Sequence, residues 1–419
     1  MKKIIAAILL IFVFIACQQT KQATTTTSKP KAYNFVAIYN PTKAALFFDH
    51  FVYINSDTSA NVFFDITFNE ANFNKNNQQI DDNKKQLNIR YVLRNKNNEI
   101  TDSNTFVYQL TDYNNFSNYF NIKLRQKENY NLTIAVYDKQ YRFTHRVVDL
   151  LDNFSNISTN KYLIQKQSYD YVEILKNKYI LKDSVYKVVS PKTEELIIEY
   201  YKPNEYTLNP PYQININKKK TQLADTSFYY QTKSTIVFNK TGNYVFKNAE
   251  GKIIFNLLCS DVSYPSISNV GDMLEPIQII ATEKEYNKVL QSSDIKLGID
   301  EYWLSLSKSQ KFAKEQIRVF YNRVKLANIF FSEDVEGWKT DRGMIYILFG
   351  PPSVINLSDE GEDWYYGEAP NVAGVLFIFE KQESSTTKIS YKLIRNNAYQ
   401  PTWAQALNTW RKGRIFNLS

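Results

Sequence analysis

Hydrophobic and polar residues alternate along the first third of the chain. Tyr130, Leu132, Ile134 and Val136, for example, occupy every second position of one segment, as in a strand that buries one face. Polar turns rich in Asn, Asp and Lys separate this segment from others like it. We therefore predict an antiparallel β-sandwich domain of immunoglobulin-like type at residues 32–155. Its predicted strands lie at residues 33–38, 45–54, 61–68, 87–93, 105–110, 119–124, 130–137 and 141–148.

A second β-rich block follows at residues 156–277. Its segments are again short and apolar, and Asn248 and Gly251 frame its clearest hairpin turn. We predict a second β-sandwich domain here, so that two sandwich domains precede the rest of the chain. The predicted strands lie at residues 186–189, 196–201, 227–230, 235–238, 244–246 and 252–258.

The hydrophobic period changes to that of helices after residue 278. Thr282 and Glu285 have the spacing of a capping box, which predicts a short helix. A helix at residues 299–306 follows, and a long helix then begins at Ser309. Apolar residues on one face of the long helix recur at every third or fourth position: Ala313, Ile317, Phe320, Val324, Ala327 and Phe331.

This apolar stripe must be buried against a sheet or against other helices. Residues 278–419 are therefore predicted to form an α+β C-terminal domain. Its last element is a predicted helix at residues 404–410, which docks on the chain's own sheet or on a partner. The predicted strands of the domain lie at residues 344–349, 364–366, 375–380 and 389–394.

The first residues of the chain have the order of a bacterial lipoprotein signal. Lys2 and Lys3 precede an apolar run at residues 4–16, and Cys17 follows. The run is shorter than the ~20 apolar residues that span a bilayer, so we expect residues 1–16 to be removed as a signal peptide. Cys17 is then the lipidated N-terminus, with acyl chains such as palmitate that anchor it by ~0.8 kcal/mol for each buried methylene. The alternative is an ordinary secretory signal in which this cysteine lies by chance.

Composition excludes several classes of site. The chain has 419 residues but only 2 histidines and 2 cysteines, too few for a disulfide framework or a structural zinc cluster to be expected. The sequence also lacks the motifs of phosphate-binding loops, nucleophile elbows and zinc proteases. We therefore expect no metal and no cofactor. We interpret His50 and His145 as ordinary strand-edge residues, and Cys259 as a small core residue.

Charge adds little to this picture. The formal net charge is +9, which is mild for this length. The densest basic cluster, at residues 218–220, is interpreted as a solvated loop, and we expect no nucleic-acid partner. Residues 17–31 are polar and Thr-rich, so they cannot form a core and are predicted to tether the lipid to the first domain.

A distinctive motif follows the long helix. Its residues are, in order, Gly337, Trp338, Lys339, Thr340, Asp341, Arg342 and Gly343, and then Gly350, Pro351 and Pro352. This order resembles the GWxTD domain family, a family of bacterial proteins that is frequent in Bacteroidetes. The resemblance covers directly about residues 333–381. It implies an envelope lipoprotein with β domains before a C-terminal domain, and it brings no catalytic assignment.

The resemblance and the signal together predict a lipid-anchored protein of the outer membrane. Lipoproteins of Bacteroidetes that are exported to the cell surface tend to carry an acidic run after the lipidated cysteine. No acidic run follows Cys17. This departure slightly favours the periplasmic face over the cell surface.

The motif has two interpretations, a structural corner of the fold or part of a recognition site. As a corner, Thr340 or Asp341 caps or braces the turn from the helix into the next strand. Arg342 then pairs with a carboxylate or with helix-end carbonyls, and Trp338 is an apolar wedge. The glycines allow backbone conformations that other residues resist, and the two prolines after Gly350 stop the strand.

A second candidate segment is rich in acidic and aromatic residues. Its members are Asp359, Glu360, Glu362, Asp363, Trp364 and Tyr365. They could bind a cation, a sugar or a basic partner. Alternatively, they form a solvated hairpin loop whose acids lie outward and whose aromatics enter the sheet.

We expect a non-enzymatic outer-membrane lipoprotein that binds or scaffolds other proteins of a cell-envelope machine, such as one for β-barrel assembly, secretion or gliding. Its partners are then the membrane, through the N-terminal lipid, and other envelope proteins. One alternative is a hydrolase of peptidoglycan or polysaccharide that uses Asp341 with Glu362 or Asp363. Another is a passive glycan-binding module that uses exposed Trp and Tyr side chains.

Overall fold

The computed structural model describes residues 38–40, 44, 46–68, 86–109, 115–138, 144–155, 158–203, 207, 209–214, 222–307, 309–367 and 374–418. These residues all belong to one compact unit that begins at Asn34. The predicted signal peptide, Cys17 and the tether lie outside the described residues, as does most of the strand predicted at 33–38. No described helix is long and apolar enough to cross a membrane.

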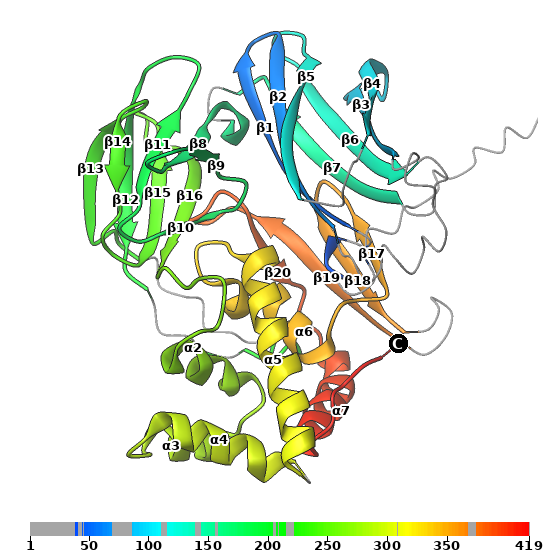
Figure 1. Ribbon diagram of the computed structural model, residues 1–419, viewed down its shortest axis with the longest axis vertical. Helices are drawn as coiled ribbons and strands as arrows, with labels where there is room; N and C mark the ends of the chain where they lie inside the picture. Colours follow the sequence, from blue (N-terminus) through cyan, green and yellow to red (C-terminus); the bar gives the residue numbers. More distant parts are fainter. Residues whose placement is uncertain are drawn as a thin grey trace, which may run out of the picture. The chain divides into compact units, whose positions relative to one another are not determined.

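The first sandwich consists of two antiparallel sheets (Figure 1). One sheet has the order β1-β2-β5 and the other the order β4-β3-β6-β7. Their inner faces share one apolar core, which includes Phe64, Ile89 and Ile134. The strands predicted between residues 45 and 148 are confirmed. They are β1 (Leu46–Ser56), β2 (Ser59–Phe68), β3 (Gln86–Asn95), β4 (Ile100–Gln109), β5 (Phe116–Lys123), β6 (Asn129–Asp138) and β7 (Thr144–Asp152).

A second pair of sheets follows. The larger has the order β10-β16-β15-β12-β13 and the smaller the order β14-β11-β8-β9. Their core includes Tyr186, Phe246 and Cys259. Burial raises the pKa of the Cys259 thiol to about 12, in keeping with a small core residue. The strands are β8 (Leu163–Gln167), β9 (Val172–Ile174), β10 (Tyr179–Leu181), β11 (Val185–Val189), β12 (Glu195–Tyr201), β13 (Thr226–Gln231), β14 (Thr235–Val237), β15 (Gly242–Lys247) and β16 (Ile253–Ser260), of which β8 to β10 were not predicted.

Helices dominate the chain after β16. The predicted capping box is present, because the Glu285 amide donates to Thr282 Oγ1 at 3.3 Å and the Thr282 amide donates to Glu285 Oε2 at 2.8 Å. Most of the apolar stripe predicted on the long helix is buried. The helices are α2 (Val270–Leu274), α3 (Glu283–Leu290), α4 (Ile295–Leu306), α5 (Gln310–Phe331), α6 (Asp341–Phe349) and α7 (Gln400–Arg411), with short 3-10 helices η3 (Thr159–Lys161), η4 (Glu275–Ile279), η5 (Gly337–Lys339) and η6 (Asn397–Tyr399).

The strand predicted at residues 344–349 is wrong, because these residues belong to helix α6. Residues 342–349 are all buried, so every face of the helix is enclosed and the sequence shows no clear period of either kind. Thr340 begins α6 as its N-cap, and Gly350, at φ +83°, ends it. The two prolines therefore follow a helix and not a strand.

The C-terminal sheet is antiparallel and has the order β17-β18-β19-β20. Its strands are β17 (Val354–Leu357), which was not predicted, β18 (Gly361–Tyr366), β19 (Val375–Gln382) and β20 (Ser390–Leu393). The predicted terminal helix is confirmed as α7 and docks on the chain's own core, where Trp410 Nε1 donates to the carbonyl of Leu348 at 2.9 Å. The same core contains Tyr39, from the start of the described chain. The boundaries predicted between the domains stay predictions.

Candidate functional site

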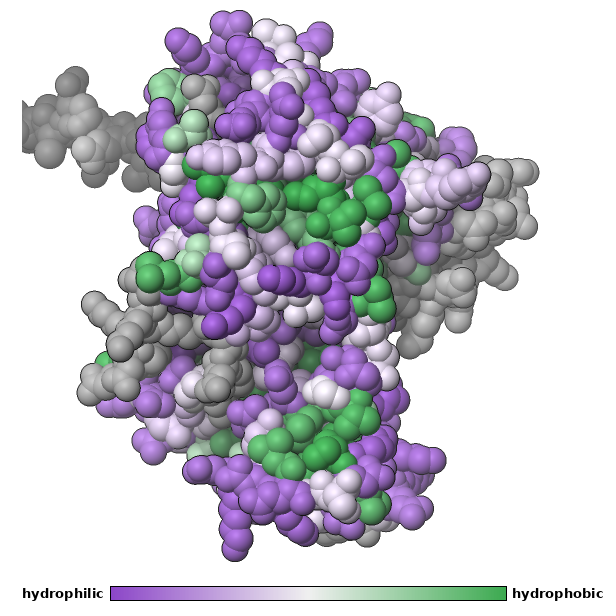
Figure 2. Space-filling model, turned by 90° about the vertical axis from the view of Figure 1, so that its left-hand side faces the viewer, coloured by the Kyte–Doolittle hydropathy of each residue, from purple (hydrophilic) through white to green (hydrophobic). Residues whose placement is uncertain are grey.

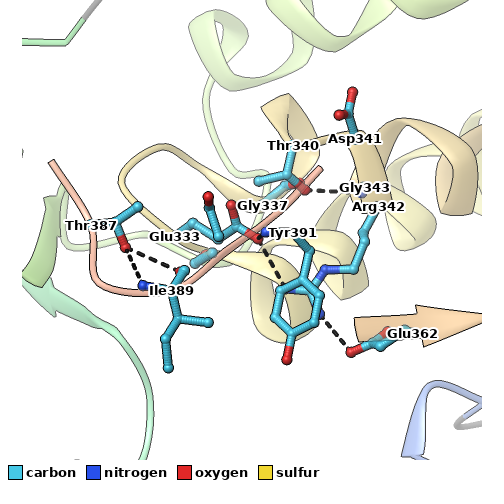
Figure 3. A network of polar contacts seen from close by, with 12 residues as sticks. Glu333, Gly337, Thr340, Asp341, Arg342, Gly343, Glu362, Thr387, Ile389 and Tyr391 are labelled. Atoms are coloured by element: carbon cyan, nitrogen blue, oxygen red, sulfur yellow. Dashed lines mark hydrogen bonds and ion pairs between the residues drawn. The ribbon is translucent and has the colours of Figure 1, made fainter. Parts of the chain in front are cut away.

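The glycine-rich motif forms the corner between α5 and α6. Gly337–Lys339 makes a single turn of 3-10 helix, and Thr340 begins α6. Thr340 Oγ1 accepts the amide of Gly343 at 3.0 Å and donates to the carbonyl of Gly337 at 2.8 Å (Figure 3). The hydroxyl thus satisfies a free amide at the start of a helix, which is the capping role predicted for it.

Gly337 and Gly343 let backbone segments approach closely. A Cβ atom on Gly337 would lie 1.9 Å from the carbonyl oxygen of Ala327, and one on Gly343 would lie 1.9 Å from the carbonyl oxygen of Gly337. Neither glycine has a positive φ angle, so the predicted reason, an unusual backbone conformation, is wrong for both. Trp338 is buried at this contact, and its amide donates to Asn328 Oδ1 at 3.1 Å.

Asp341 braces α6 against β20 and against a distant loop. Its Oδ2 accepts the amide of Leu393 at 3.0 Å, and its Oδ1 pairs with Arg395 Nη2 at 2.5 Å. Arg395 Nη1 also donates to the carbonyls of Asn209 and Pro210, each at 2.7 Å, in the segment between β12 and β13. These contacts agree with the interpretation of the motif as a structural corner.

Arg342 lies in the interior between two carboxylates (Figure 3). Its Nη1 is 2.8 Å from Glu362 Oε1, and its Nη2 is 3.1 Å from Glu333 Oε1. The guanidinium carbon lies 3.7 Å from the centre of the Tyr391 ring. Burial by itself would lower the pKa of Arg342, but the charge of Glu362 and further negative groups outweigh it and raise the pKa. Arg342 is therefore held as a cation.

Glu362 belongs to the interior and not to a solvated loop. Its Oε1 accepts from Arg342 and from the Tyr39 hydroxyl at 3.0 Å, and its Oε2 accepts from Trp364 Nε1 at 2.8 Å. The prediction that the acids of this segment lie outward is therefore wrong for Glu362. Tyr39 also accepts a hydrogen bond through its carbonyl from the Tyr346 hydroxyl at 2.8 Å, so the start of the described chain is fixed to α6.

Besides Arg342 Nε, which is buried without a hydrogen bond among the described residues, Glu333 carries an unsatisfied atom of this group. Its Oε1 accepts from Arg342 and from the Tyr391 amide at 3.0 Å. Its Oε2 is buried, and no described residue hydrogen-bonds to it. Burial raises the pKa of the Glu333 carboxyl, although the positive charge of Arg342 opposes the shift. We call Arg342, Glu333, Glu362 and Tyr39 the buried ion network.

The rest of the acidic and aromatic segment divides between the two faces of a strand. Trp364 is buried on the same face of β18 as Glu362, whereas Asp363 and Tyr365 lie half-buried on the other face. Asp359 and Glu360 are exposed in the turn before β18. The structure therefore brings only Glu362 and Trp364 of this segment to the motif, and for the other acids the predicted outward orientation holds.

A polar junction connects the motif to the second sandwich. Asn256 of β16 donates through Nδ2 to the carbonyl of Glu333 at 3.0 Å, and its Oδ1 accepts from Thr387 Oγ1 at 2.7 Å. Asn243 of β15 donates to the carbonyl of Thr386 at 2.8 Å. Strands β15 and β16 are thus hydrogen-bonded to the loop between β19 and β20, and β16 is also hydrogen-bonded to Glu333, a partner of Arg342.

Sequence reasoning missed four residues of this site: Tyr39, Glu333, Tyr391 and Arg395. Glu333 could have been suspected, because it is an acid at the end of α5, just before the motif. Tyr39 could not, because 323 positions separate it from Glu362 and nothing local marks it. Long-range contacts of this kind leave no trace in the period of a single sequence.

Both histidines lie on edge strands, as predicted, His50 on β1 and His145 on β7, but neither side chain is exposed. His50 Nε2 lies 2.7 Å from Asp149 Oδ2. Burial would lower the pKa of His50, but Asp149 outweighs it and raises the pKa. His145 is 5% exposed, and burial lowers its pKa to about 4.

Two pockets on the described surface lie away from the motif. Two surface pockets, one on α7 and one beside β12 and β15, contain none of Asp341, Glu362 and Asp363 in their walls. Among the described residues, no group of His, Cys, Asp and Glu could hold a metal ion. The hydrolase alternative stays a prediction.

Residues 242–412 match the model of the GWxTD domain. The matched region begins at β15, inside the second sandwich. No curated protein matches the chain.

Several solved structures match parts of the chain. β-Glucuronidase 2 of Bacteroides uniformis is 8% identical, with a TM-score of 0.19, over 34% of this chain and 16% of that one. A putative β-galactosidase of Bacteroides fragilis is 9% identical, with a TM-score of 0.18, over 32% of this chain and 20% of that one. Red sea bream transglutaminase is 8% identical, with a TM-score of 0.19, over 52% of this chain and 32% of that one. The chain therefore spans less than a third of each of these proteins, and such TM-scores carry no argument about fold or activity.

Proposed function

The chain carries a GWxTD domain and belongs to the GWxTD domain-containing family, and from this premise we propose that it is a non-enzymatic lipoprotein of the outer membrane. In this role it binds and scaffolds other proteins of a cell-envelope machine on the periplasmic side. Cys17 carries the lipid, and residues 17–31 hold the folded part away from the membrane surface.

The observation that carries the proposal is the internal use of the motif. Thr340 caps α6, Asp341 pairs with Arg395, and Arg342 lies between Glu333 and Glu362. Groups that are paired inside a core are poorly placed to bind a substrate or to move a proton. The motif is thus suited to hold α5, α6 and the C-terminal sheet in a fixed arrangement, as a platform for other contacts requires.

Such a platform needs a surface for its partner, and helices α3 to α5 expose apolar side chains. Leu290, Leu297, Leu304 and Phe312, which we call the helical surface, are 45%, 54%, 45% and 56% exposed. Leu297 and Leu304 share one face of α4, because positions i and i+7 of a helix lie on the same side. Figure 2 shows hydrophobic side chains gathered on the lower part of the molecule, the part in which Figure 1 places helices α2 to α5. Exposed apolar patches commonly mark protein interfaces.

Photo-crosslinking in intact cells tests this proposal. A photoreactive amino acid replaces Glu301, which is exposed between Leu297 and Leu304, and mass spectrometry identifies the captured protein. We expect one envelope protein, and we expect Leu297→Ser with Leu304→Ser to reduce its capture roughly ten-fold.

Leu223→Ser is the matched control, because Leu223 is 84% exposed but lies outside the helical surface. Its capture yield should equal that of the parent chain. Recovery of monomer alone, or equal capture in all three proteins, would count against the proposal.

A further inference from the structure

Strand β13 lies at a free edge of its sheet. The order β10-β16-β15-β12-β13 places β12 on one side of it, and no described strand pairs with its other side. Figure 1 shows β13 at the left-hand margin of the molecule. An unpaired edge is a template for pairing with another chain.

The register shows which backbone groups are free. β12 and β13 pair antiparallel, and Thr232 donates its amide to the carbonyl of Glu194 at 2.9 Å just beyond the strand. Because directly hydrogen-bonded pairs alternate along an antiparallel ladder, the even-numbered residues of β13 face β12. The odd-numbered residues, Ser227, Tyr229 and Gln231, therefore direct their amides away from β12, and Ser227 and Tyr229 also direct their carbonyls away. The carbonyl of Gln231 accepts from the amide and the hydroxyl of Ser234, at 3.2 and 2.6 Å.

The edge lacks the usual protection against pairing. Its sequence, Thr-Ser-Phe-Tyr-Tyr-Gln, contains no charged residue and no proline, and its pairing with β12 has no bulge, whereas natural edges commonly carry such features. Tyr229 is 72% exposed and Phe228 39% exposed. Val237 of β14, which follows β13 along the chain and belongs to the other sheet of the sandwich, is 51% exposed. Figure 2, which faces this side, shows a hydrophobic patch on the upper part of the molecule, at the height of the second sandwich.

We propose that β13 is the site at which two copies of this chain pair, edge to edge and antiparallel, with Tyr229 of one copy opposite Tyr229 of the other. This register pairs the free amide and carbonyl of Tyr229 in both copies, and it places Ser227 of each copy opposite the free amide of Gln231 of its mate. The two sheets then join into one continuous sheet across a two-fold axis.

Charge favours a second copy as the occupant. Lys233 follows β13 and Asp225 precedes it. In the same register, Lys233 of one copy lies alongside Asp225 of the other. Both residues are exposed. Asp225 already lies 3.6 Å from Lys202 Nζ within its own copy, so Lys233 of the mate adds a second cation beside this anion at each end of the interface. Opposite charges at matched positions fix the register of a paired strand. A strand from an unrelated protein would have to supply this arrangement by chance.

Disulfide trapping in the full chain, with Cys17 replaced by Ser, tests the proposal. Tyr229→Cys places two thiols in a directly opposed pair, whose Cα atoms lie ~5.5 Å apart, within the range that a disulfide spans. Ser227→Cys is the matched control, because its copies would lie about four residues apart along the strands, or ~14 Å. Cys259 is buried and is common to both variants.

We expect mild oxidation to convert Tyr229→Cys to covalent dimer roughly ten-fold faster than Ser227→Cys, since only the former meets the geometric requirement. A mixture of Ser227→Cys and Gln231→Cys should form the mixed dimer in preference to either homodimer. Equal trapping of all variants, or trapping of Tyr229→Cys to a different protein alone, would overturn the proposal.

A second variant avoids reliance on thiol chemistry. Tyr229→Pro removes an amide that faces away from β12, so the sheet can retain its own ladder. We expect sedimentation of this variant to show loss of the dimer, and Tyr229→Thr to retain it. A monomeric parent chain at every concentration tested would also overturn the proposal.

Discussion

Arg342 donates to Glu362 at 2.8 Å inside the C-terminal core, across twenty positions of sequence. The two side chains are only 6% and 5% exposed. A buried pair loses much solvation, so it needs further hydrogen bonds to satisfy both groups. Glu333, Tyr39 and Trp364 supply them for all but Arg342 Nε, which has no hydrogen-bond partner among the described residues. The pair therefore joins α6, β18 and the start of the described chain in one arrangement.

Removal of the cation should destabilise the fold strongly. We expect Arg342→Leu to lower the free energy of unfolding by ~3–5 kcal/mol, because two buried carboxylates lose their partner. Urea titration followed by tryptophan fluorescence measures the change. Arg318→Leu is the control, since it breaks only the exposed pair with Glu315. Equal losses in the two variants would contradict the prediction.

The hydroxyl of Tyr39 should contribute measurably to stability. Tyr39→Phe keeps the ring that packs against Phe331 and Trp364 but removes the hydrogen bond to Glu362. We expect a loss of ~1.5–3 kcal/mol, the usual value for a hydrogen bond to a charged group. Tyr169→Phe, at a fully exposed tyrosine, should leave the unfolding midpoint unchanged. An unchanged midpoint in Tyr39→Phe would mean that this segment is not docked in solution.

The close backbone contact at the motif should not tolerate a methyl group. In Gly343→Ala the new Cβ would overlap the carbonyl of Gly337. Helices η5 and α6, which contain these two glycines, can move apart only at a cost of ~3 kcal/mol. At Gly271 the nearest atom to a new Cβ is a side-chain oxygen of Asn269, at 3.2 Å. Thermal unfolding of Gly343→Ala and Gly271→Ala should show a large decrease only in the former. Similar melting temperatures would refute the close-contact explanation.

Burial of His145 predicts a loss of stability in mild acid. Its pKa is about 4 in the folded chain, against 6.5 for an ordinary histidine, so the unfolded chain binds the proton first as the pH falls. Stability is then complete above pH ~6.5 and decreases by up to roughly 3 kcal/mol towards pH 4. The contribution of His50 to stability has the opposite pH dependence. Its pKa is raised in the folded chain, so the stability it adds is present at low pH and is lost as the pH rises through the pKa of the folded chain. Urea midpoints of His145→Phe measured between pH 7 and 4.5 should decrease less than those of the parent chain.

Local patterns predicted most of the fold. Alternation along Tyr130 to Val136 identified β6, and the spacing of Thr282 and Glu285 identified the start of α3. Residues 344–349 were wrongly predicted as a strand, because a helix that is buried on every side has no polar face to reveal its period.

The candidate site was predicted only in part, for a different physical reason. Thr340, Asp341 and Arg342 could be assigned capping or bracing roles from residue type alone. Glu362 shares a strand face with Trp364, so strict use of the two-residue period would have placed it inside. The contact with Tyr39 depends on how distant segments fold together, which no local pattern encodes.

Asp341→Asn tests the central claim, that the motif builds the fold while the partner binds elsewhere. The variant keeps an acceptor for the Leu393 amide but weakens the pair with Arg395, so we expect a modest decrease in stability. The decisive measurement is the yield of crosslinked partner per folded molecule, with the photoreactive residue at position 301 in parent and variant cells. The account predicts equal yields. A folded Asp341→Asn protein that captures no partner would show that the motif itself is the recognition site.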